Sequence, residues 1–374
     1  MIYLDSAATT FQKPPSVRTA VLRAMRTMSS PGRGGYASAQ AAEETLFRCR
    51  SLAAQLFGAA GEEQVVFTAS ATEGLNIAIR SLVPPRGRVV VSGYEHNAVT
   101  RTLHALEAEV AVAASPPFVP EAAVEAFRRA LALGADAAVC THVSNVFGCV
   151  LPIEEIAGLC RAAGVPLIVD AAQSAGVLPL DLNALGAAFI AMPGHKGLYG
   201  PQGTGLLLCA HEAQPLRCGG TGSESLRQEM PDFLPDRLEA GTHNVPGIAG
   251  LAAGLAFVRR ITPERIAAHE RTLLRRAAEG LRTIPGVTVY APRDEAQQAG
   301  ALSFTAAGRT CEDVARALAE RGIAVRAGLH CAPFAHRTAG TLEGGGTVRL
   351  SVSAFSRAQE IDAFLTHLRA ILTR

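Results

Sequence analysis

The apolar run Ala187-Ala-Phe-Ile-Ala191 leads directly into Met192-Pro-Gly-His-Lys-Gly-Leu-Tyr-Gly-Pro-Gln-Gly-Thr-Gly205. The run is typical of a buried strand, and the glycines and prolines after it predict turns on both sides of Lys196. Lysine is rare in this chain, because Lys13 and Lys196 are the only lysines among 35 lysines and arginines. Since a guanidinium stays protonated, an amine that forms a Schiff base with a carbonyl cofactor must be one of these two. Lys13 lies in Phe11-Gln-Lys-Pro-Pro15, which is typical of a tail-like turn, so we expect Lys196 to be the nucleophile. The alternative is a lysine that neutralises a loop or a helix end.

Short apolar or β-branched runs alternate with helical patterns around this stretch. The runs cover residues 65–68, 89–92, 110–113, 137–143, 167–169, 187–191 and 205–209. This alternation predicts an α/β fold with a mostly parallel, seven-stranded sheet wrapped by helices. After residue 261 the pattern changes to helices at about 263–284, 311–321 and 357–372 and strands at 287–290, 301–304, 324–326 and 348–351. We therefore expect a large domain over residues 15–260 and a smaller α+β domain from residues 1–14 and 261–374.

The composition favours small-molecule chemistry in a reducing compartment. The net charge of +2 provides no basic patch for nucleic acid. The first residues reach Asp5 before any signal-like region, and the longest apolar segment, 248–258, has about half the length that a bilayer requires. The eight cysteines are scattered without zinc-site spacing, so we expect free thiols and no metal site. These features predict a cytoplasmic protein that contacts neither membranes nor nucleic acid.

Polar residues follow the predicted strands at the edge where parallel sheets bind ligands. Asp170 follows the run 167–169, where a buried carboxylate is costly unless a cation meets it. In pyridoxal-phosphate (PLP) enzymes a protonated pyridine nitrogen meets such an acid, and the Schiff-base lysine follows on a later strand. A helix cap is the alternative for Asp170. The turn Ala69-Ser-Ala-Thr72 could cradle a phosphate or provide an ordinary N-cap. His96 also follows a strand, although a lone histidine is more often structural.

Cys331 has a different setting from the other cysteines. It lies in Arg326-Ala-Gly-Leu-His-Cys-Ala-Pro333, between two predicted strands. A cysteine beside a histidine in such an accessible loop has the setting of a reactive thiol, although such pairs also arise by chance. An imidazolium at His330 would favour the thiolate, which is the nucleophilic form.

Ten short segments also occur in a specific order along nearly the whole chain. They are Leu4-Asp-Ser-Ala-Ala-Thr-Thr10, Ala71-Thr-Glu-Gly-Leu-Asn76, Glu95-His-Asn97, Val143-Ser-Asn145, Asp170-Ala-Ala-Gln-Ser174, Gly194-His-Lys196, Gly200-Pro-Gln-Gly203, Gly241-Thr-His-Asn244, residues 326–332 and Arg349. In this order the sequence resembles the cysteine desulfurase and selenocysteine lyase group of the class V aminotransferase-like, fold-type I PLP enzymes. Each segment alone is a weak signal, but all of them in register are very specific.

The resemblance implies roles for individual residues. At the cofactor, Lys196 would form the Schiff base, Asp170 would pair with the pyridine nitrogen, and His96 would stack on the ring. Gln173 and Asn145 would approach the ring hydroxyl or the substrate, Ala71 would lie at the cofactor, and Thr72 and His195 would hold its phosphate. Thr242 would reach the phosphate of a neighbouring subunit. Arg349 would bind the substrate α-carboxylate as a bidentate fork, the alternative being an exposed salt bridge on a strand.

The resemblance also implies a reaction and its partners. It indicates a PLP-dependent cysteine desulfurase that converts L-cysteine to L-alanine and transfers the sulfur to Cys331 as a persulfide. The enzyme would be a homodimer that passes its sulfur to an acceptor protein. The alternatives are a selenocysteine lyase or another PLP-dependent carbon–sulfur lyase and, more remotely, a non-catalytic binding protein on the same fold.

Overall fold

The computed structural model describes residues 1–32 and 34–373 and is built around a seven-stranded sheet. Its strands are β2 (Val65–Thr68), β3 (Arg88–Ser92), β4 (Glu109–Ala113), β5 (Ala137–Thr141), β6 (Leu167–Asp170), β7 (Phe189–Pro193) and β8 (Gly205–Cys209). The spatial order is β2-β8-β7-β6-β5-β3-β4. All neighbouring strands are parallel except β8, which is antiparallel to β2 and β7. The predicted α/β fold with a mostly parallel sheet is confirmed.

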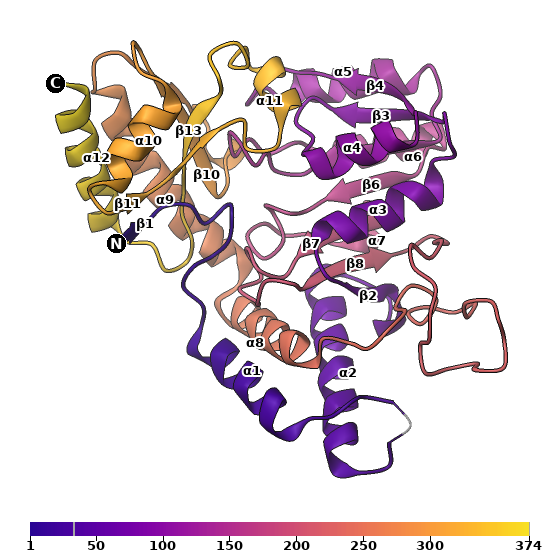
Figure 1. Ribbon diagram of the computed structural model, residues 1–374. Coiled ribbons are helices and arrows are strands. Elements are labelled where there is room, and N and C mark those ends of the chain that lie inside the picture. Colours follow the sequence, from indigo (N-terminus) through magenta and orange to yellow (C-terminus); the bar gives the residue numbers. More distant parts are fainter. Residues whose placement is uncertain (33, 374) are drawn as a thin grey trace.

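Helices cover both faces of this sheet (Figure 1). Successive strand residues point to opposite faces, so Val89 and Val91 pack into one apolar cluster and Val90 packs into the other. The first cluster includes helices α3 (Ala71–Leu82) and α4 (Asn97–Ala105). The second includes α2 (Ala37–Phe57), α5 (Pro120–Leu131), α6 (Ile153–Ala163), α7 (Leu182–Leu185) and α8 (Val245–Ile261). Burial on both faces explains why the strands are continuous apolar runs.

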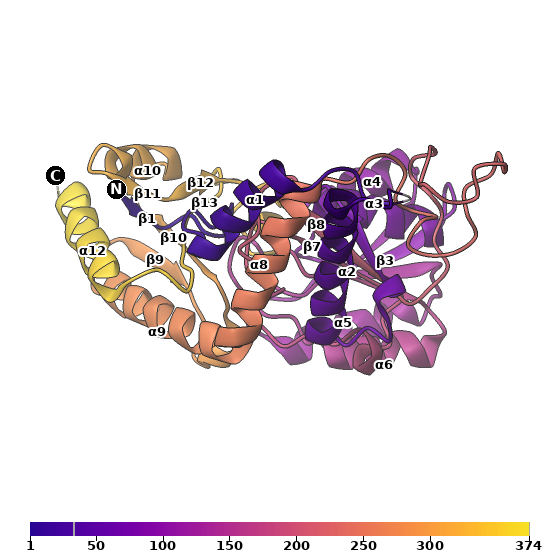
Figure 2. The same cartoon turned by 90° about the horizontal axis from the view of Figure 1, so that it is seen from below.

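The C-terminal part of the chain forms a second sheet with its own apolar cluster. Strands β9 (Val287–Tyr290), β10 (Ala301–Ala306), β12 (Arg326–Gly328) and β13 (Thr347–Ser351) make an antiparallel sheet in the order β12-β13-β10-β9. Helices α9 (Pro263–Arg282), α10 (Cys311–Ala319) and α12 (Ala358–Leu372) pack on it. Strand β1 (Ile2–Tyr3) pairs in parallel with β11 (Ile323–Ala324), and Figures 1 and 2 show the N-terminus in this region. The division into domains 15–260 and 1–14 plus 261–374 stays a prediction.

An N-terminal arm runs from β1 down to helix α1 (Pro15–Thr27), as Figure 1 shows. On its way it bonds β13 through the Ser6 N–H and the carbonyl of Ser351, and the segment after β7 through the Thr10 N–H and the carbonyl of His195. Helix α1 then packs against α8 (Figure 2). No helix in the described part of the chain is by itself long and apolar enough to cross a membrane. Helices α8 and α9 pass that test only together, and they are bent by 79° at their junction.

The structure differs from the sequence predictions at several local points. Strand β7 covers residues 189–193 rather than 187–191, because its antiparallel pairing with β8 runs from Phe189 to Pro193. The strand predicted at 324–326 is split, since β11 pairs with the N-terminal strand and β12 pairs with β13. A short helix that was not predicted, α11 (Pro333–Thr338), begins two residues after Cys331, with proline at its first turn.

Candidate active site

A pocket of about 240 Å³ opens where β2, β3, β5, β6 and β7 end. Because parallel strands end at one edge of a sheet, residues that follow different strands meet there. The pocket brings together every predicted cofactor residue except Thr242, namely Ala71, Thr72, His96, Asn145, Asp170, Gln173, His195 and Lys196. The structure therefore brings these residues together at the edge of the sheet where the sequence placed them, and their individual roles stay predictions.

Lys196 and Asp170 are the oppositely charged residues of this pocket. Asp170 is 3% exposed, and its Oδ1 accepts a hydrogen bond of 2.8 Å from the Ala172 N–H. Burial raises the pKa of Asp170, while this hydrogen bond and the charge of Lys196 oppose the rise. Burial lowers the pKa of Lys196 to about 8, although Asp170 opposes that shift. A substantial fraction of the Lys196 amine is therefore neutral slightly above neutral pH, which is the form that can attack a carbonyl.

His96 lines the pocket and also caps a helix. It is the N-cap of α4, and its Nδ1 accepts a hydrogen bond of 3.0 Å from the Ala98 N–H. This bond leaves the ring proton on Nε2. Burial, followed by the charge of Lys196, lowers the pKa of His96 to about 4. The ring is therefore neutral and fixed in orientation at neutral pH.

Two segments could hold an anion at one end of the pocket. Ser70 is the N-cap of α3 and accepts a hydrogen bond of 3.2 Å from the Glu73 N–H. The backbone N–H groups of Ala71 and Thr72 belong to the first turn, where no carbonyl of the helix can accept them. A helix N-terminus of this kind attracts anions. His195 also lines the pocket, and its Nδ1 lies 3.0 Å from Thr9 Oγ1.

The turn that carries Cys331 rests against pocket residues. Cys331 is exposed, and its carbonyl accepts a hydrogen bond of 2.7 Å from the Asn97 N–H. Asn145 Nδ2 donates a hydrogen bond of 2.7 Å to the carbonyl of His330. His330 and Cys331 have φ angles of 50° and 56°, in a region that residues other than glycine rarely adopt. Backbone strain of this kind persists where the surroundings enforce it, and it clusters at functional sites.

The prediction of an imidazolium at His330 is wrong. The His330 side chain points into the protein, where its Nε2 donates a hydrogen bond of 3.1 Å to the carbonyl of Thr347. Burial, and next the charge of Arg349, lowers the pKa of His330 to about 3. The ring is therefore neutral and does not supply a positive charge to the Cys331 thiol.

Arg349 is buried on β13, so the alternative of an exposed salt bridge is also wrong. Its Nη2 donates to Asp5 Oδ1 and its Nη1 to the carbonyl of Asn145, both at 2.8 Å. Asp5 pairs in addition with Arg326, at 3.0 Å. Within the described residues, Arg349 Nε is buried without a hydrogen-bond partner.

Asp5 and Arg326 lie within two of the sequence motifs, but neither was predicted to be a site residue. Arg326 and Arg349 are directly opposite each other on β12 and β13. Like charges in a cross-strand pair repel, so a carboxylate between them is required. That the two arginines are neighbours follows only from the register of β12 against β13, which the sequence alone did not provide.

The setting of Lys13 also differs from the sequence prediction. The tail-like turn is in fact packed against the pocket, because Lys13 Nζ donates to Thr10 Oγ1 at 2.6 Å and to the carbonyl of His195 at 2.8 Å. Burial lowers the pKa of Lys13 to about 8. Lys13 thus contacts the peptide group that joins His195 to Lys196.

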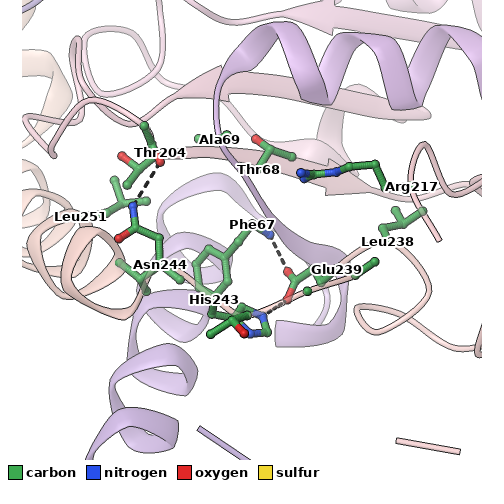
Figure 3. Close-up of a pocket in the computed structure, with 16 residues that line it drawn as sticks. Phe67, Thr68, Ala69, Thr204, Arg217, Leu238, Glu239, His243, Asn244 and Leu251 are labelled. Carbon is green, nitrogen blue, oxygen red and sulfur yellow. Dashed lines mark hydrogen bonds and ion pairs between the residues drawn. The ribbon is translucent and has the colours of Figure 1, made fainter. Parts of the chain in front are cut away.

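Thr242 lies away from the other predicted residues, in a second pocket of about 200 Å³. Figure 3 shows this pocket, with Glu239, His243 and Asn244 among the labelled residues. The loop that carries it is held by Glu239, whose Oε1 accepts hydrogen bonds from the Phe67 N–H at 2.6 Å and Arg50 Nη1 at 2.8 Å. Glu239 Oε2 contacts Arg50 Nη2 at 2.5 Å and His243 Nε2 at 2.6 Å. Burial would raise the pKa of Glu239, but these partners keep it below its usual value.

Replacing Glu239 with alanine is expected to destabilise the fold by about 3–5 kcal/mol, because the change leaves Arg50 buried without its carboxylate. Denaturant unfolding measures the loss. The matched control is Glu107→Ala, which removes an exposed partner of Arg86 and should cost less than about 1 kcal/mol. Equal losses in the two variants would contradict the structural role of the buried pair.

Comparisons with known proteins agree with this geometry. The family model described as aminotransferase class-V matches residues 2–364. A probable cysteine desulfurase from Methanothermobacter thermautotrophicus is 33% identical over 96% of this chain and 92% of its own length. Another from Mycolicibacterium paratuberculosis is also 33% identical, over 99% of this chain, which spans 55% of that longer relative. The apo structure of cysteine desulfurase from Thermococcus onnurineus has a TM-score of 0.90 and 30% identity, and covers 100% of this chain and 94% of its own. The chain therefore belongs to the class-V aminotransferase family.

Proposed function

We propose that this protein is a PLP-dependent cysteine desulfurase, which converts L-cysteine to L-alanine and retains the sulfur as a persulfide on Cys331. The observation that carries the proposal is the combination of Lys196 and Asp170 in one pocket with an exposed cysteine on an adjoining turn. The names of the relatives support the same activity.

The pocket residues fit PLP. Lys196 would hold the cofactor covalently, and Asp170, to whose Oδ2 no described residue donates a hydrogen bond, would face the ring nitrogen. His96 would lie on the ring, Asn145 and Gln173 near its hydroxyl, and Ala71, Thr72 and His195 at its phosphate. When bound, PLP supplies an aldehyde for an amine and a ring that takes up electrons from the substrate.

Chain residues would then bind the substrate and move its proton. Arg349 Nε has no hydrogen-bond partner among the described residues, and we assign it to the substrate α-carboxylate, with Asp5 holding the guanidinium in place. The free Lys196 amine, whose pKa is lowered to about 8, would take the proton from the substrate α-carbon. Arg349 donates to the carbonyl of Asn145, which lines the pocket that holds Lys196, so the two groups would act on one bound substrate.

The sulfur step would occur at Cys331. Its thiolate attacks the substrate sulfur, so that an S–S bond forms, the carbon–sulfur bond breaks, and the electron pair of that bond stays with the carbon skeleton. Protonation of the carbon skeleton gives alanine. L-cysteine and the Cys331 thiol thus give alanine and the Cys331 persulfide with no atom left over. The electrons of the broken bond reduce the carbon and the sulfur is oxidised to the same extent, so no external oxidant is needed.

The partners and location are part of the same proposal. Thr242 lies outside the pocket of its own chain, which supports a homodimer in which it reaches the phosphate of the neighbouring subunit. The exposed thiol would pass its sulfur to an acceptor protein, and all eight cysteines are free, as suits a reducing cytoplasm. We assign neither a membrane nor a nucleic-acid partner.

The decisive test is an assay of the purified protein with L-cysteine, PLP and an added thiol. Equal amounts of alanine and sulfide are expected. Comparison with L-selenocysteine measures the alternative selenocysteine lyase activity. Absence of alanine from both substrates would reject the proposal.

Replacing Asp170 with asparagine is expected to leave PLP bound but to lower turnover about 10²–10³-fold, because an ionised carboxylate no longer stabilises a protonated ring nitrogen. Absorbance measures the bound PLP and alanine formation measures the turnover. Asp181→Asn is a suitable control, since Asp181 caps the short helix α7 away from the pocket. Unchanged turnover in Asp170→Asn would mean that Asp170 is only a structural cap.

A further inference from the structure

Lys13 is a half-buried cation for which the proposed chemistry provides no role. Its Nζ donates two hydrogen bonds, to Thr10 Oγ1 and to the carbonyl of His195. No carboxylate forms an ion pair with it in the part of the chain that the structure describes. A buried ammonium without a counter-ion is costly, and the lowered pKa of Lys13 reflects that cost. Fold stability therefore does not explain why this position carries a charge.

The backbone carbonyl of His195, which accepts a hydrogen bond from Lys13, also lies within hydrogen-bond distance of three other donors. The carbonyl of His195 also receives the Thr10 N–H at 3.2 Å, Thr10 Oγ1 at 3.0 Å and Thr9 Oγ1 at 3.2 Å. Of these four contacts, the one with Lys13 Nζ is the shortest. This carbonyl belongs to the peptide bond that joins His195 to Lys196. The N-terminal arm therefore holds the backbone of the residue that carries the nucleophilic amine.

The turn around Lys196 needs such an external anchor. Gly194 and Gly197 flank His195 and Lys196, and glycine restricts the backbone least of all residues. A β-carbon at Gly197 would lie 2.3 Å from the carbonyl of Ala175, so the glycine is required by close packing there. Contacts with other segments therefore add rigidity to that of the turn's own hydrogen bonds, from the Tyr199 N–H to the carbonyl of Lys196 at 2.9 Å and from the Gly200 N–H to the carbonyl of Gly194 at 2.7 Å.

The identity of the residue at position 13 also matters. The chain uses arginine for every other cation except Lys196 and the histidines. An ammonium is a compact charge with three rotatable donors, whereas a guanidinium presents a larger planar fork. One nitrogen atom that contacts both Thr10 Oγ1 and the carbonyl of His195 suits lysine.

We propose that Lys13 is a positioning residue, which fixes the His195–Lys196 peptide so that the Lys196 amine is held in the orientation that captures PLP and handles the substrate proton. The arm that carries Lys13 runs from β1 to α1, as Figure 1 shows, and its other end holds Arg349 through Asp5. This inference rests on the proposed function, because it assumes that Lys196 is the amine that binds PLP.

The test compares Lys13→Met and Lys13→Arg with Arg18→Met in the full-length protein from which PLP has been removed. Arg18 is exposed on the first helix, so its replacement makes the same change in net charge without touching the pocket. Added PLP is followed by stopped-flow absorbance. Both Lys13 variants should attach it at least about tenfold more slowly than wild type, and Arg18→Met should match wild type.

Hydrogen exchange and steady-state kinetics separate positioning from a purely structural role. In the PLP-free protein, amides of residues 192–200 should exchange faster in Lys13→Met and be unchanged in Arg18→Met. In the reconstituted enzyme, kcat should fall while KM for L-cysteine stays within about twofold, because the substrate-binding residues are untouched. Should Lys13→Met not fold, Lys13→Arg carries the comparison.

Attachment rates and amide exchange equal to wild type in both Lys13 variants would overturn the inference, as would the same slowing in Arg18→Met. A change confined to KM would overturn it as well. If the wild-type protein does not attach PLP to Lys196, the proposed function fails instead, so the two failures are distinguishable.

Discussion

Replacing Lys196 with alanine is expected to abolish covalent attachment of PLP and to lower alanine formation from L-cysteine at least about a thousandfold. The amine has two tasks, since it holds the cofactor and then moves the substrate proton. Arginine cannot substitute, and the other lysine of the chain donates its hydrogen bonds to Thr10 and His195. Borohydride reduction followed by peptide mass spectrometry measures the attachment directly.

Lys13→Ala is the matched control for this prediction. The reduced label should remain on the peptide that carries Lys196, even if it forms more slowly. Because burial lowers the pKa of Lys196 to about 8, the protonated amine is the main form below that pH. The attachment rate in the PLP-free protein should therefore rise with pH and level off above about 8. A label on the Lys13 peptide in the wild-type protein would reject the assignment.

The sheet could be predicted from the sequence because burial on both faces leaves a distinct pattern. Runs such as 65–68 and 205–209 match β2 and β8 at both ends. The ends of β7 depend on its partner strand, so local composition placed them two residues early. The split of β11 from β12 depends on pairing with a strand more than three hundred residues away in sequence. Such non-local constraints leave no local signal.

The pocket was predictable for a similar reason. Residues that follow parallel strands meet at one edge, so the position of a residue after its strand was enough to place Asp170, His96 and Lys196 together. Side-chain direction was not predictable. His330 is adjacent to Cys331 in sequence, but its ring points inward to Thr347 and stays neutral. Because the two residues are adjacent in the chain, the sequence suggested that a charged His330 ring stabilises the Cys331 thiolate. The inward direction of the His330 side chain prevents this interaction.

Replacing Cys331 with alanine is expected to leave PLP bound while alanine formation from L-cysteine falls at least about a thousandfold. The thiol is the acceptor that permits the carbon–sulfur bond to break, and none of the described residues that line the pocket is a cysteine that could replace it. Brief exposure of the wild-type protein to L-cysteine should add one sulfur to the peptide that carries Cys331, as measured by mass spectrometry under non-reducing conditions.

Cys218→Ala provides the control for this second prediction, because Cys218 is the other exposed cysteine. That variant should retain full activity and still form the persulfide on Cys331. Selenium leaves carbon more readily than sulfur, so a selenocysteine lyase could keep its activity toward L-selenocysteine in Cys331→Ala. The loss with L-cysteine and the label on Cys331 therefore have to be measured together, since only a desulfurase requires both. If wild-type protein makes alanine from L-cysteine without added sulfur on Cys331, the thiolate attack is wrong, although the family assignment and the PLP site are unaffected.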